Sequence, residues 1–287
     1  MTGIEKIRKR WKSIDSMAGI GLDPVINRIP TDVWEAVGGK ENVSDGIFLF
    51  NREIIDATNK FVIDYKVNAN FYLGEEKLSS LYRTFEYLKK SYPEILRICD
   101  IKFSDVGNTA EKVADEIFGK LDADGVLLNP YLGIDAIKPF LEWKDKLVIL
   151  CVKTSNPSAS EIQDIITSKG MQLWREILSI ALNNWNYNKN IIPVLSATHG
   201  KDLIGIREII GQIPILLAGV GLQGGSVDKS LKYCLDKEGY GVMISASRSI
   251  IYPEILSEES YLGASIREIK KLKEEINNAK RHFEESI

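Results

Sequence analysis

Ile95-Leu96-Arg97-Ile98-Cys99-Asp100-Ile101-Lys102-Phe103-Ser104-Asp105 joins an aliphatic run to three charged side chains. The aliphatic part is typical of a buried β-strand. Side chains alternate faces along a strand, so we expect Asp100 and Lys102 to point the same way, with Asp105 just past the strand end. Removing such charges from water costs several kcal/mol per ion unless each is well partnered. The segment is a candidate active site, although a solvated strand end with one ordinary ion pair would show the same pattern.

Apolar runs of strand length recur along the chain and alternate with helical patterns, such as the one expected over Glu111–Leu121. Alternating strands and helices indicate a parallel sheet, and eight such units predict an α/β fold closed into a (β/α)8 TIM barrel. We expect one domain over residues 1–287. A six-strand doubly wound sheet is the alternative, but no G-x-G-x-x-G follows the first strand. The expected strands are Ala18–Leu22, Phe61–Tyr65, Leu96–Asp100, Gly125–Leu128, Leu147–Val152, Ile191–Leu195, Ile213–Ala218 and Gly241–Ile244.

Two amphipathic helices are expected to flank the barrel, one at each end of the chain. Each has an apolar stripe at helical spacing, which predicts packing on the barrel wall; an interaction face is the alternative. The stripes are Ile4, Ile7, Trp11 and Ile14 near the start, and Ile266, Ile269, Leu272, Ile276, Ala279 and Phe283 near the end.

Composition excludes several classes of protein. A formal net charge of -3 without a dense Lys/Arg patch argues against a nucleic-acid partner. The longest apolar stretches have the length of strands, so no membrane partner is expected. The opening Met1-Thr2-Gly3-Ile4-Glu5-Lys6 lacks an apolar signal core, which favours the cytoplasm. Three widely spaced cysteines and two histidines predict neither a disulfide framework nor a zinc or His-based metal site.

Polar residues collect where the predicted strands end, which is where barrel enzymes place their active sites. Almost every expected strand finishes in an ionisable or amide side chain, so a chance arrangement is a poor explanation. In chain order these residues are Asp23, Lys66, Asn68, Asp100, Lys102, Asp105, Asn129, Lys153, Ser155, Asn156, Gln223 and Arg248.

The last two strand ends have the composition of a phosphate site. Gly219, Gly221, Gly224 and Gly225 lack Cβ atoms, so backbone N–H groups can approach an anion closely. Gln223 adds amide donors, and Arg248 offers a planar fork for bidentate phosphate contact. Loops after strands 7 and 8 of barrels frequently bind phosphate. A glycine cluster alone could be only a tight turn, but the arginine at the next strand end favours an anion site.

Taken in order, these segments resemble the orotidine 5′-phosphate decarboxylase family, and more closely its longer subfamily (type 2). The resemblance runs from about Gly19 to Ile251. Departures at Phe103, Val106, Asn70, Leu73 and Ala218 touch neighbours of the charged positions and bear on pocket details. The matching segments are Gly21-Leu22-Asp23-Pro24, Tyr65-Lys66-Val67-Asn68, Asp100-Ile101-Lys102 through Thr109-Ala110, Asn129-Pro130-Tyr131-Leu132-Gly133, Thr154-Ser155-Asn156-Pro157, and Gly219-Val220-Gly221-Leu222-Gln223-Gly224-Gly225 with Arg248.

The resemblance implies conversion of orotidine 5′-monophosphate to UMP and CO2, the last step of de novo pyrimidine nucleotide synthesis, without metal or cofactor. It implies a homodimer with active sites at the subunit interface, and association with orotate phosphoribosyltransferase is an expected further partnership. Lys102 matches the family's proton donor. Asp100 would hold Lys102 and crowd the substrate carboxylate, and the partner subunit's Asp105 would complete the charge array.

The remaining matches imply contacts with the substrate. Lys66 would orient Asp100 and a ribose hydroxyl, Asp23 would bind the ribose, and Ser155 would contact the pyrimidine. Asn68 and Thr109 are expected substrate-binding residues as well. The phosphate would be held by Gln223, the backbone N–H groups near Gly224 and Gly225, and Arg248.

Two other functions are compatible with parts of the pattern. Sugar-phosphate enzymes such as keto-gulonate-phosphate decarboxylase or hexulose-phosphate synthase keep D-x-K-x-x-D but hold Mg²⁺ through extra carboxylates. Here the second and fourth strands end in Lys66, Asn68 and Asn129, with no spare Glu. A catalytically silent nucleotide-phosphate binding module is the other alternative, and the intact Lys102 and its two aspartates argue against it.

Overall fold

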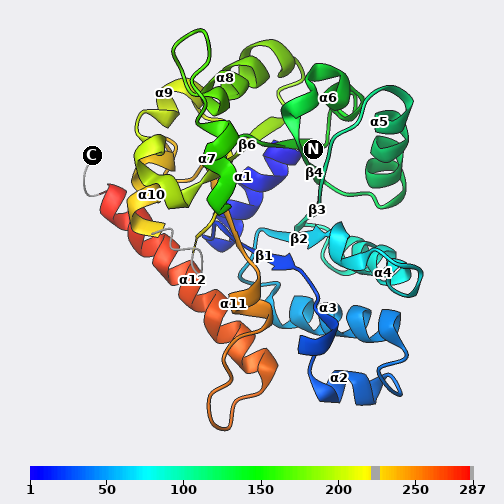
Figure 1. Ribbon diagram of the computed structural model, residues 1–287. Coiled ribbons are helices and arrows are strands. Elements are labelled where there is room, and N and C mark those ends of the chain that lie inside the picture. The colour runs from blue at the N-terminus through cyan, green and yellow to red at the C-terminus, as the bar shows by residue number, and fades with distance from the viewer. Residues whose placement is uncertain (221–226, 285–287) are drawn as a thin grey trace.

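The computed structural model describes residues 1–220 and 227–284, and its strands form a closed parallel barrel (Figure 1). The strands pair in chain order and β8 closes on β1, so the predicted (β/α)8 barrel with flanking helices is confirmed. The strands are β1 Ala18–Leu22, β2 Asp64–Asn68, β3 Leu96–Phe103, β4 Gly125–Leu128, β5 Leu147–Cys151, β6 Ile191–Ser196, β7 Ile215–Ala218 and β8 Val242–Ala246.

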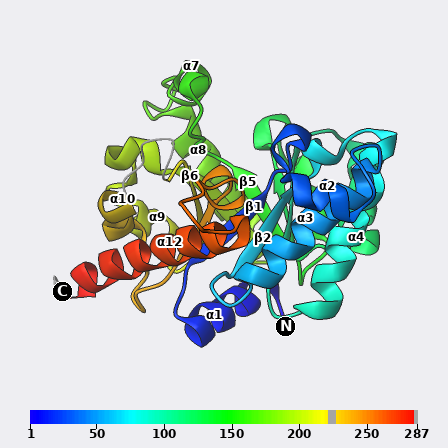
Figure 2. The same ribbon diagram turned by 90° about the horizontal axis from the view of Figure 1, so that it is seen from below.

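Helices connect and cover the strands (Figures 1 and 2). The α-helices are α1 Gly3–Ile14, α2 Thr31–Ala36, α3 Val43–Thr58, α4 Glu75–Ser91, α5 Gly107–Ala114, α6 Ile134–Leu141, α7 Ser160–Gln163, α8 Leu173–Ile180, α9 Ile206–Ile210, α10 Val227–Cys234, α11 Arg248–Ile251 and α12 Tyr261–Glu284. Short 3-10 or π turns are η1 Ile26–Arg28, η2 Ala69–Tyr72, η3 Asp115–Lys120, η4 Pro130–Leu132, η5 Pro157–Ala159, η6 Ala181–Trp185 and η7 Ala197–Leu203.

The second strand was predicted three residues too early. The expected strand Phe61–Tyr65 overlaps β2 only at Asp64 and Tyr65, because β2 covers Asp64–Asn68. Asp64, Lys66 and Asn68 share one face of this strand, while Tyr65 and Val67 are fully buried on the other. The apolar run therefore marks only the approach to the strand. A strand with a polar face inside a barrel gives no continuous apolar signal.

The other boundaries differ from prediction by small amounts. β3 runs three residues beyond Asp100, to Phe103, and β7 begins at Ile215 rather than Ile213. The helix expected over Glu111–Leu121 is divided into α5 and the π turn η3. These shifts leave the order of strands unchanged.

Helix α1 covers the end of the barrel where the strands begin (Figure 2). Its buried Lys6 donates through Nζ to Asp124 Oδ2, just before β4, at 2.8 Å. Arg10 donates to the carbonyl of Val62, before β2, and Arg8 to that of Gln212, before β7. The apolar stripe of α1 is buried at Ile7 and Trp11, as predicted. This end is therefore closed, and the opposite end is left for a site.

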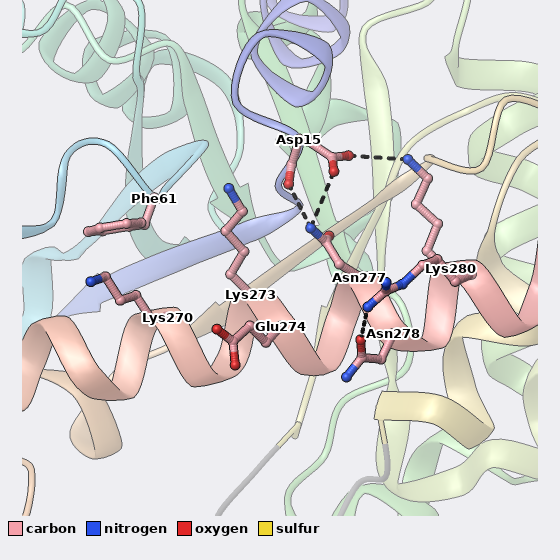
Figure 3. A pocket seen from close by; sticks show the side chains of 9 residues that line it. Asp15, Phe61, Lys270, Lys273, Glu274, Asn277, Asn278 and Lys280 are labelled. Atoms are coloured by element: carbon pink, nitrogen blue, oxygen red, sulfur yellow. Dashed lines mark hydrogen bonds and ion pairs between the residues drawn. The ribbon is translucent and has the colours of Figure 1, made fainter.

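Helix α12 runs along one side of the molecule and packs against α3, α10 and α11 (Figure 1). Ile269, Leu272 and Ile276 of its apolar stripe are buried, which confirms the packing prediction. The helix also reaches the turn after α1, where Lys273 donates to the carbonyl of Ile14. In the same turn Lys280 pairs with Asp15 (Figure 3). Among the described helices, none combines the length and the apolar character needed to span a membrane.

Gly19 on β1 lies against the carboxyl group of Asp64 on β2, so we expect Gly19→Ala to destabilise the barrel. An added Cβ would stand 2.1 Å from Asp64 Oδ1, far inside contact distance. Overpacking of this kind typically costs about 1–3 kcal/mol of unfolding free energy. Gly119→Ala is the matched control, since its Cβ would meet only Trp143, at 3.6 Å. Denaturant unfolding that shows equal stability for Gly19→Ala and the wild type would contradict this close packing.

Candidate active site

β3 supplies the centre of the site, and its last residues leave regular strand geometry. Asp100 pairs with Leu127 of β4 while Phe103 pairs with the next residue, Leu128, so Ile101 and Lys102 bulge out of the ladder. Lys102 has φ 48°, in the left-handed region that side chains other than glycine rarely adopt. The expected contact is nevertheless present, with Lys102 Nζ 2.7 Å from Asp100 Oδ1. The bulge, rather than simple strand alternation, aims Lys102 at Asp100.

Asp100 is a buried carboxylate held between two ammonium groups. Only 2% of its side chain is exposed, and it accepts from Lys66 Nζ at 2.9 Å as well as from Lys102. Lys66 comes within reach because β2 lies beside β3, with Asn68 opposite Asp100. Burial by itself would raise the Asp100 pKa, but the two lysines outweigh it and lower that pKa. The carboxylate therefore stays ionised at neutral pH.

Lys66 is surrounded by carboxylates. Burial alone would lower its pKa, but Asp100, Asp23 and Asp64 together raise it above the ordinary value. Asp23 follows β1 directly, and its Oδ1 is buried with no hydrogen-bond partner among the described residues. A buried acceptor without a donor is costly, so a hydroxyl group of a bound molecule would stabilise Asp23. This geometry suits the ribose contact expected of Asp23.

Three expected site residues lie around the mouth of the barrel: Asn68 and Asp105 make hydrogen bonds to nearby residues of their own loops, and Thr109 is exposed. Asn68 Oδ1 accepts from the side chain of Asn70, at 3.0 Å, and from its backbone N–H. Asp105 Oδ1 accepts from the backbone N–H of Val106 at 2.8 Å. Thr109 is exposed on the first turn of α5. Within one chain Asp105 therefore caps its own loop, and its expected role at a partner's site stays a prediction.

The expected pyrimidine and phosphate residues are only partly described. Ser155 follows β5 and is half-buried, and Arg248 opens α11 directly after β8 with its side chain exposed. Gln223, Gly224 and Gly225 lie outside the described residues. Both described residues thus lie at the carboxyl end of the barrel, as expected.

An ion pair that sequence reasoning missed attaches α7 to the end of β5. Lys153 is 2% exposed, and its Nζ pairs with Asp164, the residue that ends α7. Gln163 accepts from the backbone N–H of Thr154 and donates to its Oγ1, at 2.9 and 2.8 Å. These contacts attach α7 to the strand end next to Ser155. Lys153 was visible at a strand end, but Asp164 looked like any surface carboxylate.

Asp64 is the second residue that the sequence analysis missed. Its carboxyl is fully buried, and Ser245 of β8 donates to Oδ2 at 3.0 Å. Oδ1 has no hydrogen-bond partner among the described residues. Burial raises the Asp64 pKa to about 7, against smaller opposing effects of Ser245 and Lys66. An aspartate two residues before Lys66 on one strand face was the available signal.

Among the described residues, no three His, Cys, Asp or Glu side chains are grouped so that they could hold a metal ion. That the reaction itself needs no metal ion stays a prediction, which a measurement of turnover would test.

A parallel barrel whose strand ends carry a Lys-Asp-Lys array around the buried Asp100 is typical of a barrel enzyme, and comparisons with known proteins identify its family. The model described as Orotidine 5'-phosphate decarboxylase / HUMPS family matches residues 51–253, more than half of the chain. Curated orotidine 5'-phosphate decarboxylases from Cellvibrio japonicus and Cupriavidus necator are 36% and 33% identical, over 98% of this chain and 100% of their own. The solved Leishmania donovani OMP decarboxylase is 26% identical with a TM-score of 0.81, covering 98% of this chain and 99% of its own. The chain belongs to the orotidine 5′-phosphate decarboxylase family and is an enzyme.

The raised pKa of Asp64 predicts a pH-dependent stability that Asp64→Asn should remove. Between about pH 4 and about pH 7 the folded protein keeps a proton on Asp64 that the unfolded chain has lost. Asp64 therefore destabilises the wild type progressively as pH rises through this window, by up to about 4 kcal/mol. Because Asn stays neutral, the stability of Asp64→Asn relative to the wild type should increase with pH by that amount. Denaturant titrations at several pH values measure it, and a constant difference would contradict the buried, protonated carboxyl.

Proposed function

We propose that the chain converts orotidine 5′-monophosphate to UMP and CO2, the last step of de novo pyrimidine nucleotide synthesis, through the Lys66-Asp100-Lys102 array. The observation that carries the proposal is the buried Asp100 carboxylate between two ammonium groups, of which Lys102 is half exposed toward the mouth. The family of the chain fits this reaction.

The array supplies what this decarboxylation needs. When the C6–carboxylate bond breaks, its electron pair stays on C6 and neutral CO2 leaves. The ammonium of Lys102 would stabilise the developing charge and then donate its proton to C6. Because Asp100 holds Lys102 at 2.7 Å before substrate arrives, little reorganisation is needed during reaction. Such preorganised electrostatics would have to supply much of a barrier reduction toward the top of the usual range of about 8–23 kcal/mol.

Asp100 would also act on the substrate directly. A second carboxylate beside it repels the ionised Asp100, and this repulsion disappears as neutral CO2 forms. Lys66 would keep Asp100 ionised and contact a ribose hydroxyl, and Asp23 would accept from the ribose through its unpartnered oxygen. Ser155 would meet the pyrimidine, with Asn68 and Thr109 as further substrate contacts.

The phosphate would bind at the ends of β7 and β8, held by Gln223, the backbone N–H groups near Gly224 and Gly225, and Arg248. Arg248 is exposed at the start of α11, so its guanidinium is available to an anion. Phosphate binding far from C6 can be expressed as transition-state stabilisation at the ring.

We also propose a homodimer in which the partner subunit's Asp105 completes each site. In support, large apolar side chains are exposed around the loop that carries Asp105. Leu73, Val106, Tyr131 and Leu132 are 60%, 45%, 74% and 47% exposed, and they lie on the segments that follow the adjacent strands β2, β3 and β4. Apolar surface of this kind is typical of an interaction site.

Three further proposals concern the location, the folding unit and the partner of the enzyme. We infer a cytoplasmic enzyme, which fits the free state of Cys99, Cys151 and Cys234. We infer one folding unit over residues 1–287, because α1 and α12 both pack on the barrel. Association with orotate phosphoribosyltransferase stays a proposal, which copurification of the two enzymes tests.

Lys102→Ala should lower kcat by at least about a hundredfold, the typical effect of losing a positioned acid. An absorbance assay of orotidine 5′-monophosphate consumption measures the change, with circular dichroism as the check on folding. A folded Lys102→Ala protein that keeps more than about a tenth of wild-type turnover would remove Lys102 from the proton-donor role.

Wild-type turnover should survive exhaustive EDTA treatment, because we expect no metal ion in the reaction. A loss of turnover that Mg²⁺ restores would favour a metal-dependent sugar-phosphate enzyme instead.

Arg248→Ala should reduce kcat/KM strongly for the nucleotide and hardly at all for the unphosphorylated nucleoside. The reason is that only the nucleotide offers a charged group to the guanidinium fork. Steady-state kinetics with both substrates measure the two losses. Equal losses would place Arg248 outside the phosphate site.

Mixing two inactive variants tests whether Asp105 serves the other subunit. If Lys102→Ala and Asp105→Ala are refolded together, each heterodimer gathers both lesions in one shared site and leaves the other intact. Half of the random dimers are heterodimers with one intact site each, so about a quarter of wild-type activity should return. No gain, in a mixture that mass spectrometry shows to contain heterodimers, would refute the shared site.

A further inference from the structure

A buried carboxyl group lies in the barrel interior, directly below the charged array. Asp64 precedes Lys66 by two residues on β2, so the two side chains share the inner face of the strand. Gly19 is opposite Ser245 in the β1–β8 pairing, and both flank Asp64. The missing side chain at Gly19 leaves the space that Asp64 Oδ1 occupies. Gly19 and Ser245 therefore provide the space and one hydrogen bond for this buried carboxyl group.

Asp64 extends the array of alternating charges into the core. Lys66 Nζ binds Asp100 Oδ2, and Lys102 Nζ binds Asp100 Oδ1. The charge of Asp64 acts on Lys66 from below, while Asp100 and Asp23 act on it from above. With Asp64 neutral, two lysines balance Asp100 and Asp23; with Asp64 ionised, the cluster carries one excess negative charge.

We propose that Asp64 is a positioning residue for decarboxylation, whose neutral carboxyl keeps the Lys66-Asp100-Lys102 array balanced and whose ionisation weakens catalysis through Lys66. The proposal rests on the proposed function. An ionised Asp64 competes with Asp100 for the Lys66 ammonium and places negative charge below an anionic substrate. Both effects oppose substrate binding and the carbanion, and in a site screened from water they act strongly.

The surroundings of Asp64 place its titration in the working range of an enzyme. Burial raises its pKa to about 7, against smaller lowering effects of the Ser245 hydrogen bond and the Lys66 charge, and its Oδ1 has no hydrogen-bond partner among the described residues. The charged group that faces it is Lys66, from its own strand. β1 contributes Gly19 and β8 contributes the Ser245 hydroxyl, while Asp100, Lys102 and Asp23 act through Lys66. The neutral form, and full catalysis, should therefore be present below about pH 7 and lost as pH rises through it.

The test compares pH profiles of kcat/KM for orotidine 5′-monophosphate in the wild type, Asp64→Asn and Ser245→Ala. Wild-type kcat/KM should fall by about tenfold across an inflection near pH 7, which Asp64→Asn should lack because its amide stays neutral. Ser245→Ala removes the hydrogen bond that favours the ionised form, so its inflection should move to higher pH. Titration of the substrate phosphate affects all proteins alike and cancels in their ratios.

Asp56→Asn is the matched control, because this α3 carboxylate binds Tyr87 and Tyr92 outside the barrel, and it should keep the wild-type inflection. If Asp64 had only a structural role, Asp64→Asn would change the free energy of unfolding and leave the pH profile of kcat/KM unchanged. Identical profiles for the wild type and Asp64→Asn would overturn the proposal. If Asp64→Asn fails to fold, Ser245→Ala decides, and an unmoved inflection overturns it. Absence of decarboxylation in the wild type itself would instead refute the proposed function.

Discussion

The ionised state of Asp100 is the constraint on which the site depends. A carboxylate with 2% exposure would ordinarily take up a proton, and it stays charged here because two lysines from adjacent strands contact its two oxygens. That arrangement needs β2 beside β3, a bulge that turns Lys102 back, and carboxylates that keep Lys66 charged. Removing one partner would leave a buried charge uncompensated, which is strongly destabilising.

Much of the barrel could be predicted because most strands are buried on both faces and appear as continuous aliphatic runs. β4 and β5 are such strands, and their predicted positions are right to within one residue. β2 was predicted three residues too early because the polar side chains of Asp64, Lys66 and Asn68 on its inner face interrupt the apolar run. The strand that brings Lys66 to Asp100 therefore has no continuous apolar signal in the sequence.

The candidate site was predictable in its parts but not in its contacts. Asp100 and Lys102 were named from strand spacing, yet the left-handed backbone of Lys102 depends on pairing with β4 that no local pattern shows. The Lys153–Asp164 pair joins residues 11 positions apart, from the end of β5 to the end of the short helix α7, which periodicity cannot detect. Asp64 looked like a surface residue because burial of an aspartate depends on the glycine of a neighbouring strand.

The contacts of α1 carry a consequence for the order of folding during synthesis. This helix is synthesised before every strand of the barrel, yet Lys6 binds Asp124, 118 residues later, and Arg8 binds the carbonyl of Gln212, 204 residues later. Its apolar face, with Ile7 and Trp11, has no barrel to cover until most strands have been made. The nascent chain thus leaves the apolar face of α1 uncovered until the later strands have been made, and transiently exposed apolar surface of this kind makes partly folded chains prone to aggregation.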